Sequence, residues 1–315
     1  MADKLRIIID TDPGQDDAVA ILLALASPDE IEVLGIVAVA GNVPLDKTAD
    51  NARRVVALAG RADVPVYAGS ARPMVRALTT AEHVHGKSGL DGYALPAATV
   101  PLAGAHGVDF LVDTLMAEPP STITLATLGP LTDVAMALVK EPRISPRIRE
   151  IVMMGGAYFE VGNITPAAEF NIHVDPEAAD VVMQSGIPIT MAPLDVTHRV
   201  LATRPRKDAI AAIGNRVGEA VAGLLSFSER FDLSKYGSLG APLHDPCVIA
   251  YLLKPELFSG RTINVSIETQ GALTLGMTVA DWWGITDRPR NVRFLRAADA
   301  DGFFALLTAR LARLP

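Results

Sequence analysis

The sequence predicts an α/β fold, in which a single domain is built on a mostly parallel, open, Rossmann-like sheet flanked by helices. Short runs rich in β-branched residues alternate with Ala- and Leu-rich stretches of helical spacing through the first two-thirds of the chain. This alternation is typical of βαβ units on a parallel sheet. No internal repeat or low-complexity linker interrupts the 315 residues. Residues 1–315 are therefore expected to form one domain with its own core.

The alternation defines five strands and five helices in order. Each strand is a short apolar run, and each helix carries apolar residues three and four positions apart. The expected strands are 5–10, 31–39, 123–127, 151–153 and 187–191, and the expected helices are 17–26, 47–59, 108–117, 131–139 and 176–184.

The last third of the chain has a different pattern, which we interpret as decoration of the same domain. Helices are expected over about 215–231, directly after Asp245, and at the end of the chain. Strands are expected near 262–268 and 291–295. In an open parallel sheet, ligands bind at the carboxyl ends of the strands, so the residues that follow each strand are the first candidates for chemistry.

Composition and charge exclude several classes of protein. The net charge is -8, whereas binding to a nucleic-acid backbone needs clustered Lys and Arg. Cys247 is the only cysteine, so no intrachain disulfide can form, and nothing indicates an oxidising compartment. The apolar run near the N-terminus is too short for a signal peptide or a membrane span. We therefore expect a cytoplasmic protein that binds neither nucleic acid nor membrane.

Four carboxylates follow the first strand within eight positions, at Asp10, Asp12, Asp16 and Asp17. Helix N-termini favour Asp by about 0.3–1 kcal/mol per residue, which explains one or two of them. Two carboxylates about 4 Å apart repel by about 4 kcal/mol at an effective dielectric of 20, so four need neutralisation. Protonation can neutralise one group, whereas a hard divalent cation can neutralise them all. Oxygen ligands favour Ca²⁺ or Mg²⁺ over zinc.

The string DTDPGQDD at 10–17 resembles the signature of the inosine-uridine preferring nucleoside hydrolase family. Further segments of that family's pattern follow over nearly the whole chain. Because they occur in the same order as in the family, the resemblance is specific. They are VAGN at 39–42, HGKSGLDG at 85–92, LGPLTD at 128–133, MGG at 154–156, NITPAAEFN at 163–171 and HDP at 244–246.

The resemblance implies a Ca²⁺ site at the floor of a pocket, where the ion holds the ribose diol and the attacking water. Its ligands would be the carboxylates of Asp12, Asp17 and Asp245 and the backbone carbonyl of Leu128. Leu128 stands where the family pattern has Thr, which matters little because the ligand is a main-chain oxygen. A net negative site suits the positive charge that develops on ribose as the C–N bond breaks.

Two residues are assigned to proton transfer. Asp12 is expected to be the general base, because it can reach both the ion and the water. His244 is the candidate acid for the leaving base. The neighbouring carboxylate of Asp245 is expected to keep its imidazole protonated. A histidine with a purely structural role is the alternative for His244.

Several polar residues are expected to bind the sugar. Asp16 would accept a hydrogen bond from a ribose hydroxyl, with N-capping of the first helix as the alternative. Asn42 follows a strand and either faces the pocket or serves as a turn residue. By resemblance, Asn163 and Glu169 address the 5′-hydroxyl and Asn171 addresses the lower hydroxyls. Met154 is also expected at the pocket, where it packs on the ribose or on the core.

The base side of the pocket is less well defined by the sequence. His85 resembles the histidine that lines this side, on a Gly-rich loop, whereas His83 is expected to be incidental. Phe227, Phe231 and Tyr236 lie where the family carries a base-contacting segment, and their rings could stack on a nucleobase. This region does not match the family residue by residue, so no specific role is assigned.

The expected function is that of a nucleoside N-ribohydrolase, which uses Ca²⁺ and water to release ribose and free nucleobase in nucleoside salvage. One alternative is a haloacid-dehalogenase-like, Mg²⁺-dependent phosphohydrolase, because that class also places DxD after an apolar strand. Another is a non-catalytic protein that binds calcium or nucleosides. A homodimer or homotetramer is expected. The choice between purine and pyrimidine nucleosides is not predicted.

Overall fold

A nine-stranded sheet forms the centre of the molecule. The computed structural model describes residues 4–237 and 239–315, without the side chains of residues 232, 235 and 236. The strand order in this sheet is β10-β9-β11-β6-β5-β4-β1-β2-β3. The strands are β1 (Leu5–Thr11), β2 (Ile31–Ala38), β3 (Val66–Ala68), β4 (Ile123–Thr127), β5 (Ile148–Met154), β6 (Ile189–Ala192), β9 (Phe258–Ile267), β10 (Thr278–Asp281) and β11 (Val292–Ala298).

Neighbouring strands from β11 to β3 pair in parallel, and β9 pairs antiparallel with both β11 and β10. The predicted α/β fold with a mostly parallel sheet is therefore confirmed. Buried parallel strands need apolar residues on both faces. In β1 the side chains of Ile7 and Ile9 join the core on one face, and that of Ile8 joins the core on the other.

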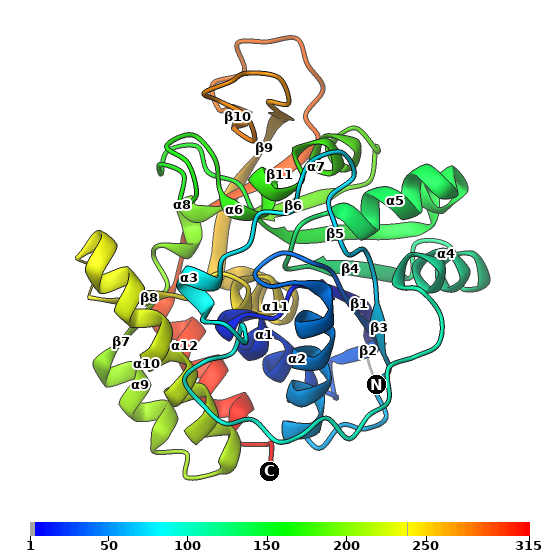
Figure 1. Cartoon of the computed structure of the whole chain (residues 1–315). Helices are drawn as coiled ribbons and strands as arrows, with labels where there is room; N and C mark the ends of the chain where they lie inside the picture. Colours follow the sequence, from blue (N-terminus) through cyan, green and yellow to red (C-terminus); the bar gives the residue numbers. More distant parts are fainter. Residues whose placement is uncertain (1–3, 238) are drawn as a thin grey trace.

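Helices cover both faces of the sheet and make a three-layer molecule (Figure 1). The core on one face includes residues of α1 (Gln15–Leu25), α2 (Leu45–Leu58), α10 (Arg216–Tyr236), α11 (Pro246–Leu253) and α12 (Ala300–Leu311). The core on the other face includes residues of α4 (Gly107–Ala117), α5 (Thr132–Lys140) and α7 (Pro176–Met183).

Short elements complete the chain and connect the layers. The antiparallel pair of β7 and β8 lies beside α9 and α10, at the left of Figure 1. The sequence patterns predict none of the following short elements, which lie in segments expected to be loops. They are α3 (Glu82–His85), η1 (Pro142–Arg147), α6 (Phe170–Val174), α8 (Leu194–Thr197), β7 (Leu201–Thr203), α9 (Arg204–Ala211), β8 (Gly240–Pro242) and η2 (Pro255–Leu257).

The predicted strands and helices are all present, with ends that shift by a few residues. β5 begins at Ile148, whereas the sequence predicted a start at 151. The prediction was too short because residues 149 and 150 are charged and interrupt the apolar run. α10 continues past 231 to Tyr236 and ends at Gly237, whose left-handed φ of 61° is typical of a helix C-terminus. Within the described residues, no helix combines the length and apolar character that crossing a membrane requires.

Candidate active site

A pocket of about 870 Å³, its open mouth included, lies at the carboxyl ends of the parallel strands. This is where the topology of an open α/β sheet places ligands. The predicted residues that line it are Asp16, Asn42, His85, Leu128, Met154, Asn163, Glu169, Asn171, His244 and Asp245.

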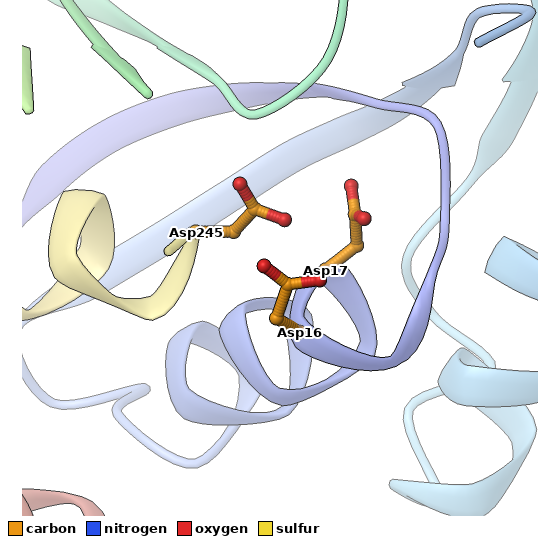
Figure 2. Close-up of side chains that lie close together, drawn as sticks. All are labelled: Asp16, Asp17 and Asp245. Carbon is orange, nitrogen blue, oxygen red and sulfur yellow. The ribbon is translucent and has the colours of Figure 1, made fainter. Parts of the chain in front are cut away.

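Three carboxylates converge at the floor of this pocket. Asp16 and Asp17 lie in the first turn of α1, and Asp245 directly precedes α11, from the distant last third of the chain. Each offers an oxygen, and these oxygens lie within 4.8 Å of one another. Figure 2 shows the three side chains directed into one space between the two helix starts. The sequence predicted that Asp12, Asp17 and Asp245 meet. The structure brings Asp17 and Asp245 together, with Asp16 instead of Asp12 as the third member of the cluster.

The first turn of α1 holds Asp17 in a fixed position. Its Oδ1 accepts a hydrogen bond of 2.6 Å from the Thr11 hydroxyl, and its Oδ2 accepts one of 2.9 Å from the backbone N–H of Gly14. The Asn42 side-chain amide donates to the same Oδ2 at 3.3 Å. The N-cap of α1 is Gly14, so the alternative of N-capping by Asp16 is wrong.

Asp12 lies below this group, in a cradle made by two glycines. Its Oδ2 accepts a hydrogen bond of 2.7 Å from the backbone N–H of Asn42, while its Oδ1 is buried and has no partner in the described part of the chain. A Cβ atom at Gly41 would lie 2.1 Å from Oδ2, and one at Gly129 would lie 2.5 Å from Oδ1. Both positions therefore require glycine so that the backbone can approach the carboxylate.

Burial and mutual repulsion disfavour the charged form of these carboxylates. Burial first, then the charges of Asp17 and Asp16, holds the pKa of Asp12 well above its usual range. Burial and the charges of Asp16, Asp17 and Asp12 act in the same way on the pKa of Asp245. None of the ion pairs among the described residues involves these four groups. A hard dication with oxygen ligands would fit such a site.

Asp10 is separate from this group, which corrects the expectation that one cation neutralises all four acidic residues after β1. Its carboxylate is buried without a partner among the described residues. Burial and the charge of Asp133 hold its pKa well above the usual range. The Asp133 Oδ1 accepts hydrogen bonds from the backbone N–H and hydroxyl of Ser70, at 2.8 and 2.7 Å. Asp10 in β1 and Asp12 just after the strand thus have different acidic neighbours.

Asn171 organises one wall of the pocket. Its side-chain amide donates to the carbonyl oxygen of Leu128 at 2.7 Å, and to the carbonyl oxygen and Sδ of Met154 at 3.3 and 3.4 Å. The carbonyl predicted as an ion ligand is therefore fixed in the pocket wall. A carbonyl oxygen has a second lone pair, so this hydrogen bond leaves it able to bind a cation.

The loop before α6 is held by its own polar side chains. The Glu169 carboxylate accepts hydrogen bonds from the backbone N–H groups of Gly156, Asn171 and Ile172, at 2.9, 3.0 and 3.3 Å. The Asn163 Oδ1 accepts one of 2.8 Å from the N–H of Phe170. Glu169 and Asn163 both line the pocket, so this loop is a structured wall.

His244 is held at the opposite wall, between Thr197 and His198. Its Nδ1 lies 2.8 Å from the Thr197 hydroxyl, and its ring centroid lies 5.7 Å from that of His198. Burial, with smaller effects from His198 and His85, lowers the pKa of His244 to about 3. The expectation that Asp245 keeps this imidazole protonated is therefore wrong, because burial disfavours the charged ring and Asp245 is not among the groups that shift its pKa.

Two further histidines line the pocket near its mouth. His85 Nδ1 lies 2.6 Å from Oε1 of Gln15, and burial lowers the pKa of His85 to about 4. His83 lines the pocket as well, with its ring edge-on to Phe231 at a centroid distance of 5.7 Å. The interpretation of His83 as incidental is thus wrong. A helical turn at α3 places both histidines on the same wall.

The aromatic residues of α10 have different positions. Phe231 lines the pocket, whereas the ring of Phe227 packs under the guanidinium of Arg230, 4.0 Å away. The side chain of Tyr236 lies outside the described residues. Several residues that line the pocket were not predicted from the sequence. For His198 a signal was available, because the segment LDVTH at 194–198 follows the end of β6. These residues are Ala81, Val84, Ile164, Phe170, His198, Ser228 and Pro242.

Comparison with known proteins places the chain in a family. The sequence profile of the inosine-uridine preferring nucleoside hydrolases matches residues 7–305. The chain belongs to this nucleoside hydrolase family. The predicted family and enzyme class, that of ribonucleoside N-glycosidases, are confirmed, and membership excludes the haloacid-dehalogenase alternative.

Relatives of this nucleoside hydrolase match it over nearly their full length. An uncharacterised protein of Schizosaccharomyces pombe is 54% identical over 99% of this chain and 100% of its own. The pyrimidine-specific ribonucleoside hydrolase RihA of Shigella boydii is 48% identical over 98% of both chains. A plant nucleoside hydrolase structure superposes with a TM-score of 0.92 at 30% identity, and covers 98% of this chain and 99% of its own.

Calcium is expected to stabilise this hydrolase, and the effect should grow with pH. Because the pKa values of Asp12 and Asp245 are raised in the folded protein, the folded state binds protons more tightly than the unfolded state does. The free energy of unfolding of the ion-free protein therefore decreases as pH rises through those pKa values. Ca²⁺ would bind the ionised carboxylates and would stabilise the folded protein by about 2.7 kcal/mol at a hundredfold excess over Kd. The difference in Tm between Ca²⁺-loaded and chelator-treated protein should therefore be larger at pH 8 than at pH 5. A difference that is absent, or that also persists in Asp245→Asn, would contradict this site.

Proposed function

We propose that this nucleoside hydrolase cleaves the N-glycosidic bond of pyrimidine ribonucleosides and gives ribose and free base. The observation that carries the proposal is the meeting of Asp16, Asp17 and Asp245 beneath a pocket with polar walls. Such a floor offers acceptors for the vicinal hydroxyls of ribose and a place for a cation. The base side is lined by histidines and Phe231, which suits a flat heterocycle with acceptor atoms.

The residues that would hold Ca²⁺ are Asp12, Asp17, Asp245 and the carbonyl of Leu128. Their oxygens are the ligand type that this ion prefers, and the oxygens that Asp17 and Asp245 offer lie within 4.8 Å of one another. When bound, Ca²⁺ supplies positive charge that neutralises the carboxylates and makes a nearby water more acidic. Asp16 belongs to the same carboxylate cluster and would accept a hydrogen bond from a ribose hydroxyl.

Asp12 would act as the general base. Its Oδ2 is engaged by the Asn42 N–H, so Oδ1 is the oxygen that can take a proton from water. The hydroxide portion of that water would add to C1′ of the ribose while the C1′–N bond breaks. A carboxylate with a raised pKa is a better proton acceptor than an ordinary one.

The pocket floor would also stabilise the transition state. Breaking the glycosidic bond builds positive charge on the ribose ring, and a net negative floor favours that charge. Asn171, Asn163 and Glu169 would fix the ribose hydroxyls, and Met154 and Asn42 would contact the sugar and floor. Orientation of the sugar would place C1′ over the attacking water.

His244 would donate a hydrogen bond from its neutral ring to the departing base. The base leaves with the electron pair of the broken bond, so a hydrogen-bond donor that stabilises this negative charge lowers the barrier. His85 would line the same side. With its low pKa, His244 is neutral at pH 7, and it acts through its N–H hydrogen instead of as an imidazolium.

The pyrimidine preference rests on the 48% identity with RihA proteins described as pyrimidine-specific. We expect kcat/KM for uridine and cytidine to exceed that for inosine and adenosine when release of free base is measured side by side. Activity should disappear with a chelator and return with Ca²⁺. Failure to release any base in the presence of Ca²⁺ would favour the non-catalytic binding protein instead.

Replacement of the proposed base should abolish turnover without unfolding the protein. We expect Asp12→Asn to lower kcat for uridine by several orders of magnitude, because an amide cannot accept the proton. Asp287→Asn, at an exposed position, is the matched control and should keep the activity of the natural chain. Near-normal kcat in Asp12→Asn, with unchanged circular dichroism, would show that another group is the base.

Loss of the proposed donor should depend on the leaving group. We expect His244→Ala to lower kcat at least about a hundredfold for uridine, and far less for a p-nitrophenyl riboside, whose leaving group needs no proton. The ratio of the two losses is the measurement. Equal losses on both substrates would exclude His244 as the donor.

Calcium as the particular ion, the cytoplasmic location and the homodimeric or homotetrameric state remain predictions. Metal analysis of the purified protein addresses the first of them. Sedimentation at several protein concentrations addresses the assembly.

A further inference from the structure

We propose that Thr197 is a positioning residue that fixes the tautomer of His244. Its hydroxyl donates to Nδ1, so that Nε2 carries the ring hydrogen and offers it to the departing base. The proposal deepens the assignment of His244 as donor and rests on the proposed function for its catalytic consequence. The hydrogen bond itself can be tested independently of turnover.

The geometry places Thr197 directly behind the ring. Thr197 is the last residue of α8 and is fully buried, with no exposed surface. Its Oγ1 lies 2.8 Å from His244 Nδ1. His244 lines the pocket, so the ring has one nitrogen engaged by the protein interior and Nε2 left for the substrate side.

The direction of this hydrogen bond follows from hydrogen-bond accounting. In the described part of the chain the Thr197 hydroxyl has no other partner, and His244 Nδ1 has none besides this hydroxyl. If Nδ1–H donated to Oγ1, the hydroxyl hydrogen would be buried without an acceptor. A buried hydroxyl hydrogen without an acceptor costs more free energy than one hydrogen bond contributes. The hydroxyl therefore donates to Nδ1, and the neutral ring carries its hydrogen on Nε2.

α8 is anchored so that Thr197 cannot readily move away. The buried carboxylate of Asp195 accepts hydrogen bonds from the backbone N–H groups of residues 158, 159 and 160, at 3.0, 2.7 and 3.3 Å. The N–H of Leu194 donates to the carbonyl of Gly156 at 2.9 Å. These contacts attach α8 to the loop that follows β5, which forms another wall of the pocket.

The segment before His244 is attached to the same unit. The N–H of Leu243 donates to the carbonyl of Val200 at 2.9 Å, and β8 pairs with β7 just after α8. The backbone of His244 and the hydroxyl of Thr197 are thus held in one small framework. Such a framework keeps the distance between the two side chains fixed while the base is bound and released.

The test compares Thr197→Val, which removes the hydroxyl and keeps the shape, with Thr197→Ser, which keeps the hydroxyl. Thr124→Val is the matched control, because Thr124 is also fully buried but its hydroxyl has no partner in the described chain. In each ion-loaded protein, ¹⁵N NMR of labelled histidines reports which ring nitrogen of His244 carries hydrogen. His244→Gln assigns the signal. Steady-state kinetics with uridine and p-nitrophenyl riboside are then measured.

We expect the natural chain, Thr197→Ser and Thr124→Val to show the Nε2–H form, and Thr197→Val to show a mixture of tautomers. We also expect Thr197→Val to lose about tenfold or more in kcat for uridine, with KM within about twofold and little loss on p-nitrophenyl riboside. An Nδ1–H form in the natural chain would overturn the proposal, as would an unchanged tautomer in Thr197→Val. If the tautomer changes as expected but no variant releases base, the proposed function fails and the hydrogen bond stands.

Discussion

The burial of several carboxylates in one place, with no ion pair to a cationic side chain among the described residues, is the constraint on which the rest of the site depends. Asp12, Asp17 and Asp245 are each almost completely buried, and the charges of Asp12 and Asp17 disfavour the ionised form of Asp245. Repulsion of this size competes with the net stability of a whole domain. In the proposed function a bound cation compensates for this repulsion, and the site keeps the negative charge that favours cleavage of the glycosidic bond.

The fold satisfies this constraint by joining distant segments at one edge of a parallel sheet. β1 leads into the first turn of α1, which supplies Asp17, and the start of α11 supplies Asp245 from the last third of the chain. Two glycines, Gly41 and Gly129, follow β2 and β4 and let the backbone close around Asp12. The decorated C-terminal third is therefore part of the site, because it supplies both Asp245 and the neighbouring His244.

The sequence predicted the sheet and the floor of the pocket well, because both depend on local patterns. Apolar runs mark β1 and β4, and the order of strands puts their ends together. The sequence failed where burial and long-range contacts decide. It could not show that desolvation lowers the pKa of His244 to about 3, nor that α10 brings Phe231 against His83. The Thr197 contact joins segments that share no local pattern, so it needed the three-dimensional structure.

The central claim is that Asp245 completes a single Ca²⁺ site with the acidic residues of α1. Calorimetric titration of Ca²⁺ into chelator-treated protein, with the natural chain and Asp245→Asn side by side, tests it most directly. The account predicts one ion per natural chain and a loss of at least about a hundredfold in affinity for the variant, because a buried charged ligand is removed. Equal affinity in both proteins, or no binding by the natural chain, would contradict it.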